Sequence, residues 1–248
     1  MPRCYLALGG NLGRVAVTFE RALESLRRDP AIGLVGVSRF VETVPLGGDQ
    51  PVYLNAVAAL DTTASAIALL DLARKIEADC GRVRDVRWGP RTLDLDLILY
   101  GHDVIDTARL NVPHPACWYR RFVLDPLVEI APDAWHPVKQ LTASQLRDRL
   151  LARPFHLSIA GESVSARVPD LIESLQPEFP DVVFTDWRER DIPSDRNPAP
   201  TIVAWLGPRG DTDVSFDDLP LAERLDASDA AEPPDLFLGY VLQAALGR

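Results

Sequence analysis

Hydrophobic positions in the first hundred residues follow two periods, that of a helix and that of a strand. A period near 3.6 predicts helices over 15–28 and 64–79, the first stopped by Pro30 and the second capped by Thr62 or Thr63. Short apolar or alternating runs predict strands over 3–8, 34–42, 52–61 and 93–100. The resulting order, β-α-β-β-α-β, is typical of a ferredoxin-like α+β sandwich with both helices on one face of an antiparallel sheet.

The remainder of the chain separates into a continuation of this domain and a different C-terminal segment. The stretch 43–51, rich in Pro and Gly, is predicted as a loop, and helices are expected near 121–130 and 142–151. Ten of the 21 prolines follow Pro154. Beyond it, 155–161, 181–187 and 201–207 resemble strands, 165–175 and 236–246 resemble helices, and 208–235 is a polar stretch expected to be mobile. We therefore expect domains at 1–154 and 155–248, the second a small α/β extension of unknown role.

The net charge of −10 is unevenly distributed. Residues 155–248 carry 7 Arg and no Lys against 18 Asp and Glu, whereas residues 1–154 carry 19 basic and 18 acidic residues. Nucleic acid is not an expected partner, because that affinity comes mainly from neutralising phosphates with a basic face. No apolar run approaches the ~18 residues of a membrane span. Three cysteines without metal-ligand spacing indicate reduced thiols and a cytoplasmic protein: Cys4, Cys80 and Cys117.

The candidate chemistry is concentrated between residues 82 and 100. Asp94 and Asp96 are two positions apart on a predicted strand, so both carboxylates face the same side, roughly 6–7 Å apart at Cα. Without a local lysine partner they would repel each other unless a cation joins them. Paired carboxylates suit Mg²⁺ that also binds substrate phosphates. A solvated strand face with two ordinary aspartates is the alternative that a bare D-x-D pattern would favour.

The residues before this strand favour the magnesium site over the solvated strand face. Gly81, Gly89 and Pro90 indicate a loop that carries arginines, and guanidinium groups bind phosphate oxygens in bidentate fashion. Trp88 within the same loop indicates a surface that covers a ligand. The loop arginines are Arg82, Arg84, Arg87 and Arg91. A loop of this kind beside paired carboxylates is typical of a magnesium–nucleotide phosphate site.

Two further turns are candidates for ligand contact. The run Gly9 to Gly13 lacks both the P-loop and the dinucleotide patterns, so we interpret it as a strand-to-helix turn in which Asn11 tolerates unusual dihedral angles. Direct ligand contact by this turn is the alternative. His114 lies between two prolines in an extended turn and precedes Arg120. It can contact a phosphate or a base, or be structural.

Seven segments, in order, resemble the 6-hydroxymethyl-7,8-dihydropterin pyrophosphokinase family over about residues 5–132. They are GGNLG at 9–13, TVPLG at 43–47, YLN at 53–55, GRVR at 81–84, RWGPRTLDLDLIL at 87–99, VPHP at 112–115 and RRFVLDPLVEIAP at 120–132. The resemblance implies the ferredoxin-like fold and the transfer of pyrophosphate from ATP to the pterin hydroxymethyl group in folate synthesis, with release of AMP. It implies two Mg²⁺ ions bound by Asp94 and Asp96.

The resemblance also implies roles for other residues, position by position. Arg82 and Arg91 would steady the phosphates during in-line attack on the β-phosphorus. Positions that contact ATP in the family correspond to Glu77, Arg84, Leu97, His114 and Arg120. Positions that hold the pterin correspond to Thr43, Pro45, Tyr53, Asn55, Trp88 and Phe122. Aromatic rings and an amide suit a flat heteroaromatic substrate.

The chain departs from the family pattern at three positions. Gly10 replaces a serine, Val44 lies where proline is common, and Ala116 replaces a basic residue after the PHP turn. The last change removes one expected phosphate contact, and none of them touches the two aspartates. Two other functions are alternatives: a non-catalytic pterin- and ATP-binding relative, and a bifunctional folate enzyme whose extension is a second module. A homodimer through the extension is a further hypothesis.

Overall fold

The computed structural model describes residues 1–46, 50–82, 89–161, 167–189, 199–207 and 215–248. By their contacts they form one unit of Met1–Arg147 with Ala244–Arg248, and a second unit of Asp148–Gln243. The Arg84 and Trp88 positions lie outside the described residues. The elements of the first unit are β1 Arg3–Gly10, α1 Val15–Arg28, β2 Ile32–Val37, β3 Val41–Thr43, β4 Tyr53–Thr62, α2 Ala66–Asp79, β5 Asp94–Tyr100, β6 Ile105–Asp106, β7 Asn111–Val112, α3 Arg121–Ile130, β8 Trp135–His136 and β9 Leu141–Thr142.

The main sheet of this unit is antiparallel, with strands in the order β2-β4-β1-β5 and the short β3 beside β4. Apart from the division of the second predicted strand into β2 and β3, the expected succession of strands and helices up to residue 100 is present, and the unit is of the α+β class. Strand β1 lies between β4 and β5, with Gly9 opposite both Asn55 and Asp94. The central position of β1 therefore brings the ends of β4 and β5 to the same edge of the sheet.

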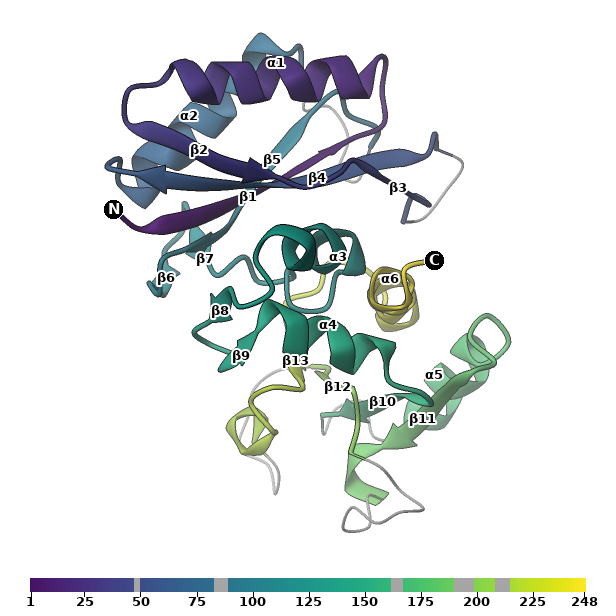
Figure 1. Cartoon of the computed structure of the whole chain (residues 1–248). Coiled ribbons are helices and arrows are strands. Elements are labelled where there is room, and N and C mark those ends of the chain that lie inside the picture. Colours follow the sequence, from purple (N-terminus) through teal and green to yellow (C-terminus); the bar gives the residue numbers. More distant parts are fainter. Residues whose placement is uncertain (47–49, 83–88, 162–166, 190–198, 208–214) are drawn as a thin grey trace. The chain divides into compact units, whose positions relative to one another are not determined.

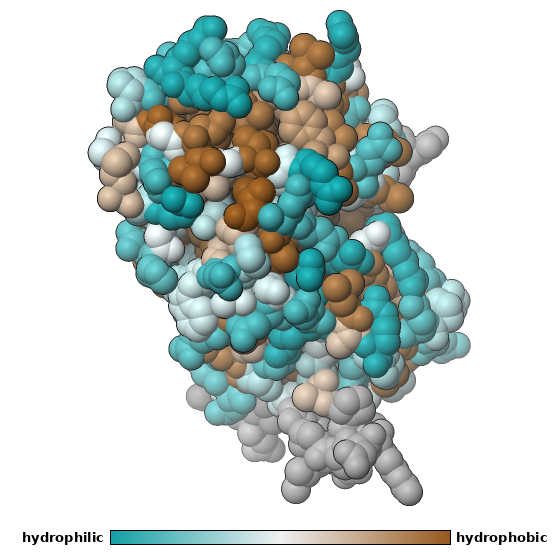
Figure 2. All heavy atoms as spheres, in the orientation of Figure 1, coloured by the Kyte–Doolittle hydropathy of each residue, from teal (hydrophilic) through white to brown (hydrophobic). Residues whose placement is uncertain are grey.

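Helices α1 and α2 lie on one face of this sheet and α3 on the other (Figure 1). Helix α1 has the predicted bounds and buries Phe19, Ala22, Leu23 and Leu26. On the face shown in Figure 2, hydrophilic side chains cover the layer of α1 and hydrophobic ones gather at the level of the sheet beneath it. One core thus forms between helices and sheet, with Leu6, Leu8, Leu60, Leu69 and Leu95 among its members.

The predicted cap of the second helix was wrong. Helix α2 begins at Ala66, and Ser65 is its N-cap, because the Ser65 hydroxyl accepts a hydrogen bond from Ala68 N at 3.2 Å. Thr62 cannot serve, since its buried hydroxyl donates to Ala31 O at 2.9 Å and accepts from Ala64 N at 3.0 Å.

The predicted strand 34–42 was also wrong as a single element. Pairing with β4 shifts register between Leu34 and Gly36, and β2 ends at Val37. Ser38 then replaces a ladder partner: its hydroxyl accepts from Val57 N and its own N–H donates to Val57 O, both at 2.9 Å. Because the Ser38 hydroxyl takes the place of a backbone acceptor, the chain leaves the sheet after β2. Pairing resumes in β3, where Val41 lies opposite Asn55.

Strand β5 divides its side chains between the core and the opposite face. Leu93, Leu95, Leu97 and Leu99 are buried, while Asp94 and Asp96 point to the other face. Ile98, which shares the face of the aspartates, is 1% exposed. The aspartates therefore lie at the edge of a covered surface.

The second unit contains a four-stranded parallel sheet in the order β11-β10-β12-β13. The strands and helices expected near 155–161, 181–187, 201–207, 165–175 and 236–246 are present. Strand β13, Arg224–Asp226, and the 3₁₀ turn η3, Phe216–Asp218, were missed within the polar stretch 208–235. The remaining elements are α4 Ala143–Leu151, β10 Phe155–Ala160, α5 Val168–Leu175, β11 Val182–Asp186, η2 Trp187–Glu189, β12 Ile202–Trp205 and α6 Pro234–Leu246. Among the described helices, none has the length and apolar character needed to cross a bilayer.

Candidate active site

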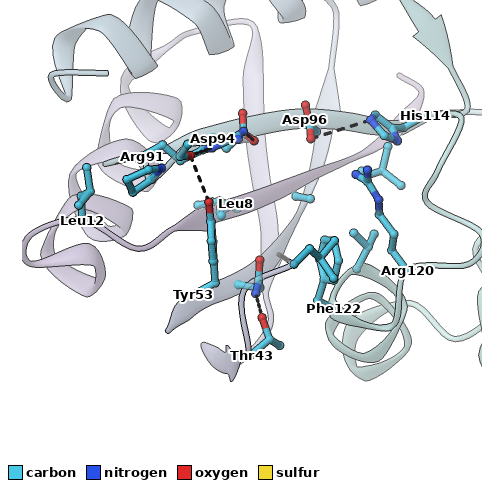
Figure 3. A pocket seen from close by; sticks show the side chains of 18 of the residues that line it. Leu8, Leu12, Thr43, Tyr53, Arg91, Asp94, Asp96, His114, Arg120 and Phe122 are labelled. Atoms are coloured by element: carbon cyan, nitrogen blue, oxygen red, sulfur yellow. Dashed lines mark hydrogen bonds and ion pairs between the residues drawn. The ribbon is translucent and has the colours of Figure 1, made fainter. Parts of the chain in front are cut away.

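A cavity of about 760 Å³ lies in the first unit, where β1 ends and β4 and β5 begin, beside the start of α3. Side chains from these elements project toward it (Figure 3). Its ionisable lining residues are Arg82, Arg91, Asp94, Asp96, His114 and Arg120. Its other lining residues are Ala7, Leu8, Gly9, Leu12, Thr43, Val44, Leu46, Tyr53, Asn55, Gly89, Pro90, Ile98, Phe122 and Val123. The cavity therefore has a charged part and a part with two aromatic rings.

The two aspartates of β5 have different surroundings. Asp94 is bound by arginines on both oxygens: Arg82 Nη1 donates to Oδ1, and Arg91 Nη1 donates to Oδ2 at 2.5 Å. Among the described residues Asp96 has no such partner. The nearby His114 places its Nε2 4.0 Å from Asp96 Oδ2. The expectation that a cation joins these carboxylates is met at Asp94 by two arginines.

The environment of Asp96 disfavours its charge in the absence of a ligand. Burial of the carboxyl group against the cavity floor, followed by the negative charge of Asp94, raises the pKa of Asp96 to about 6. A bound cation would oppose both effects, so the pair of carboxylates fits a hard divalent ion. Among the described residues, no group of three or more His, Cys, Asp or Glu could hold a metal by itself. Two carboxylates can still bind Mg²⁺ if phosphates and water complete its coordination.

Arg82 is held in place from behind the cavity. Its Nη1 also donates to Glu77 Oε1, and the same carboxylate oxygen accepts Leu95 N–H at 2.8 Å. Glu77 is 3% exposed and does not line the cavity. It therefore links α2, β5 and the guanidinium, so that Arg82 presents a charge of fixed position to the cavity.

The PHP turn contributes a neutral imidazole beside Asp96. His114 N–H donates to Ile98 O at 3.0 Å, and His114 Nδ1 accepts Ala116 N–H at 3.2 Å. Burial, and then the charge of Arg120, lower the pKa of His114 to about 4. A neutral ring that accepts at Nδ1 carries its proton on Nε2, so His114 presents an N–H donor toward the carboxylates.

The aromatic part of the cavity combines stacking surfaces with an amide. Tyr53 lies at the start of β4, and its hydroxyl donates to Gly89 O at 3.4 Å. Asn55 Nδ2 donates to Thr43 Oγ1 at 2.7 Å. Phe122 is approached by the Arg120 guanidinium, 5.5 Å from its ring centroid. These side chains can enclose a flat ring system and hydrogen-bond its edge.

The structure brings most of the predicted site residues together. Ten of them line the cavity: Thr43, Tyr53, Asn55, Arg82, Arg91, Asp94, Asp96, His114, Arg120 and Phe122. Pro45 lies between two lining residues without lining the cavity itself. The side chain of Leu97 is 3% exposed and belongs to the core on the opposite face of β5.

Sequence reasoning missed part of the site. Ala7, Leu8 and Gly9 line the cavity from β1, and strand alternation alone did not reveal it because both faces of β1 are largely buried. The interpretation of Asn11 was wrong. The residue of this turn with positive φ is Gly13, at 72°, whereas Asn11 is 5% exposed and accepts Arg91 N–H on Oδ1 at 2.8 Å.

Curated relatives and solved structures resemble this chain. One relative is the 2-amino-4-hydroxy-6-hydroxymethyldihydropteridine pyrophosphokinase of Pseudomonas aeruginosa. It is 46% identical over 154 residues, which cover 62% of this chain and 93% of the relative. One of the same name from Haemophilus influenzae is 44% identical over 142 residues, 57% of this chain and 89% of the relative. The structure of Plasmodium falciparum HPPK-DHPS with pteroate matches with a TM-score of 0.50 at 12% identity.

That structural match covers 98% of this chain and 60% of the longer Plasmodium chain, and at this identity it concerns the fold alone. Sequence similarity is more specific. A sequence profile for 7,8-dihydro-6-hydroxymethylpterin-pyrophosphokinase (HPPK) matches residues 5–132, which is just over half of the chain. This chain therefore belongs to the 7,8-dihydro-6-hydroxymethylpterin-pyrophosphokinase family.

Proposed function

We propose that this protein transfers the pyrophosphoryl group of ATP to 6-hydroxymethyl-7,8-dihydropterin in folate biosynthesis. The pterin hydroxyl oxygen forms a bond to the β-phosphorus, the bond from that phosphorus to the oxygen of the α-phosphate breaks, and AMP leaves. The hydroxyl proton passes to solvent. Two carboxylates, three arginines and two aromatic rings around one cavity are the observation that carries this proposal.

Asp94 and Asp96 are the proposed ligands of two Mg²⁺ ions. When bound, these ions would supply positive charge that offsets the negative charge of the phosphates during transfer. The mutual repulsion of the carboxylates and the raised pKa of Asp96 support this role. No strong base is needed, because phosphoryl transfers depend mainly on positioning and electrostatic stabilisation.

The arginines are proposed to bind and align the triphosphate. Arg82 and Arg91 flank Asp94 and would share the phosphate charge with the metal ions. His114 and Arg120 would contact ATP from the PHP side. Glu77 would act through Arg82. Arg84 and Leu97 stay predictions of ATP contact.

The aromatic part of the cavity is proposed to hold the pterin. Tyr53 and Phe122 offer ring faces, and the Asn55 amide, bound to Thr43, offers an edge for hydrogen bonding. Pro45 and Trp88 are proposed to complete this pocket.

The strand order β2-β4-β1-β5 supports a ferredoxin-like arrangement for the catalytic part. We propose a pyrophosphokinase domain of 1–154 and an extension of 155–248, in a cytoplasmic protein whose partners are small molecules and not nucleic acid or membrane. A homodimer through the extension is proposed as well. Sedimentation of the full chain and of a chain ending at Pro154 would test it, and an unchanged oligomeric state would refute it.

The function is tested by measuring AMP release with ATP, Mg²⁺ and the pterin. We expect pterin-dependent AMP formation by the wild-type chain, and none by Asp96→Ala. Removing one of two adjacent carboxylates relieves repulsion, so the Tm of the variant should equal or exceed that of the wild type. The control is Asp103→Ala, an exposed aspartate in the turn after β5.

Binding without turnover by the wild-type chain would favour the non-catalytic alternative. Near-normal turnover by Asp96→Ala would contradict the metal assignment.

A further inference from the structure

The side chain of Asn11 connects three segments that are far apart in the sequence. Its Oδ1 accepts Arg91 N–H at 2.8 Å, and its Nδ2 donates to Gln50 Oε1 at 3.3 Å and to Pro51 O at 3.2 Å. The residue is 5% exposed, so water does not replace these partners easily. It does not line the cavity, although the residues it binds lead directly to cavity walls.

One connection fixes the main chain of Arg91. In addition to the bond to Asn11 Oδ1, Arg91 O accepts Asn11 N–H at 2.9 Å and Leu12 N–H at 3.1 Å. Both polar groups of the Arg91 backbone are therefore held by the turn after β1. The Arg91 side chain then reaches Asp94 at 2.5 Å, so the position of the guanidinium depends on this anchor.

The other connection reaches the segment that leads into β4. Gln50 and Pro51 precede Tyr53, the first residue of β4 and a wall of the aromatic part of the cavity. Asn11 thereby joins the phosphate side and the aromatic side of the cavity through a single carboxamide.

The chemistry of the position favours asparagine. A carboxamide offers one acceptor and one donor group in a fixed plane, which matches an N–H on one side and two oxygens on the other. Aspartate would place a carboxylate against Pro51 O, and alanine would leave the partly buried Arg91 N–H without its acceptor.

We propose that Asn11 is a positioning residue that sets the separation of the two walls of the cavity. This inference rests on the proposed function, because it assigns Arg91 to the phosphates and the β4 side to the pterin. Loss of the Arg91 connection lowers kcat, and loss of the connection to Gln50 and Pro51 raises KM for the pterin. If the turn contributed only to the stability of the fold, loss of the two connections would not affect kcat and KM separately.

Steady-state kinetics of two variants test the division. Asn11→Asp keeps an acceptor for Arg91 N–H and loses the donor, so we expect KM for the pterin to rise about tenfold with kcat within about threefold of wild type. Asn11→Ala loses both connections, and kcat/KM should fall about 100-fold, the effect of a misplaced reacting group.

Thr62→Val is the matched control. Thr62 is fully buried and its hydroxyl also makes two hydrogen bonds, but it lies at the end of β4 away from Tyr53. We expect it to lower the Tm and leave both kinetic constants unchanged. Equal kinetic constants for Asn11→Ala and Thr62→Val would overturn the proposal, as would a uniform loss of kcat in Asn11→Asp without a change in KM.

A readout without turnover separates this inference from the proposed function. Hydrogen exchange of the Arg91 amide in the ligand-free protein, followed by NMR, should accelerate at least about tenfold in Asn11→Ala and stay near wild type in Asn11→Asp. Failure of the wild-type chain to release AMP would contradict the proposed function, and the exchange result would still decide whether Asn11 anchors Arg91. Unchanged exchange in Asn11→Ala would overturn the anchor.

Discussion

The guanidinium of Arg82 donates a hydrogen bond to the carboxylate of Glu77, and both side chains are largely withdrawn from water, at 14% and 4% exposure. Breaking a buried ion pair by removing one partner is costly because the remaining charge stays buried. The cavity charge of Arg82 is thus coupled to the stability of the fold.

Arg82→Ala should lower the free energy of unfolding by about 3 kcal/mol, since it leaves the Glu77 carboxylate buried without this partner. Adding Glu77→Gln should recover part of that loss, because an amide oxygen can still accept Leu95 N–H without burying a charge. Urea denaturation of the single and double variants measures both effects. A double variant less stable than Arg82→Ala would contradict the coupling.

Thr43→Val should weaken pterin binding more than it weakens ATP binding. The substitution removes the acceptor of Asn55 Nδ2, 2.7 Å away, and leaves the Asn55 amide free to rotate. Loss of one such hydrogen bond corresponds to about a fivefold to tenfold higher KM for the pterin. Kinetics with each substrate varied in turn provide the measurement. Thr43→Ser keeps the hydroxyl and serves as the control, and an equal loss in both variants would contradict the role of this hydrogen bond.

Much of this organisation could be predicted where the determining contacts are local. The bounds of α1 follow from the spacing of Phe19 and Leu23 and from Pro30. Strand alternation correctly predicted that Asp94 and Asp96 lie on one face of β5. The arginine loop that precedes them in the sequence indicated a magnesium–nucleotide phosphate site.

Other features depend on partners distant in sequence. Asn11 acts through Gln50 and Arg91, and nothing near GGNLG indicates them. Strand β13 consists of three residues that pair with Val203–Trp205 in a parallel sheet, so no hairpin signal marks it. Leu97 shows a limit of inference from family resemblance. The resemblance placed Leu97 at the ATP site, whereas its side chain faces the core.

The N-cap of α2 is a local contact that was assigned to the wrong residue, and it can be tested directly. Ser65→Ala should destabilise the protein by about 1 kcal/mol, because Ala68 N–H loses its acceptor. Thr63→Ala should change stability by less than about 0.5 kcal/mol, since the Thr63 side chain is exposed and does not cap the helix. Chemical denaturation compares the two. A larger effect at Thr63 would show that the cap chosen from sequence was correct.

His136 should make stability depend on pH between about 4 and 6.5. Burial, and then the charge of Lys139, lower the pKa of His136 to about 4, and Nδ1 accepts Lys139 N–H at 3.1 Å. The unfolded chain therefore binds a proton that the folded protein excludes, so stability is full above pH 6.5 and falls as the pH approaches 4, by up to about 3 kcal/mol. His136→Asn keeps an acceptor for Lys139 N–H but does not titrate. The difference in unfolding free energy between wild type and variant should shrink on acidification, and a difference that is independent of pH would show that the pKa of His136 is the same in the folded and unfolded states.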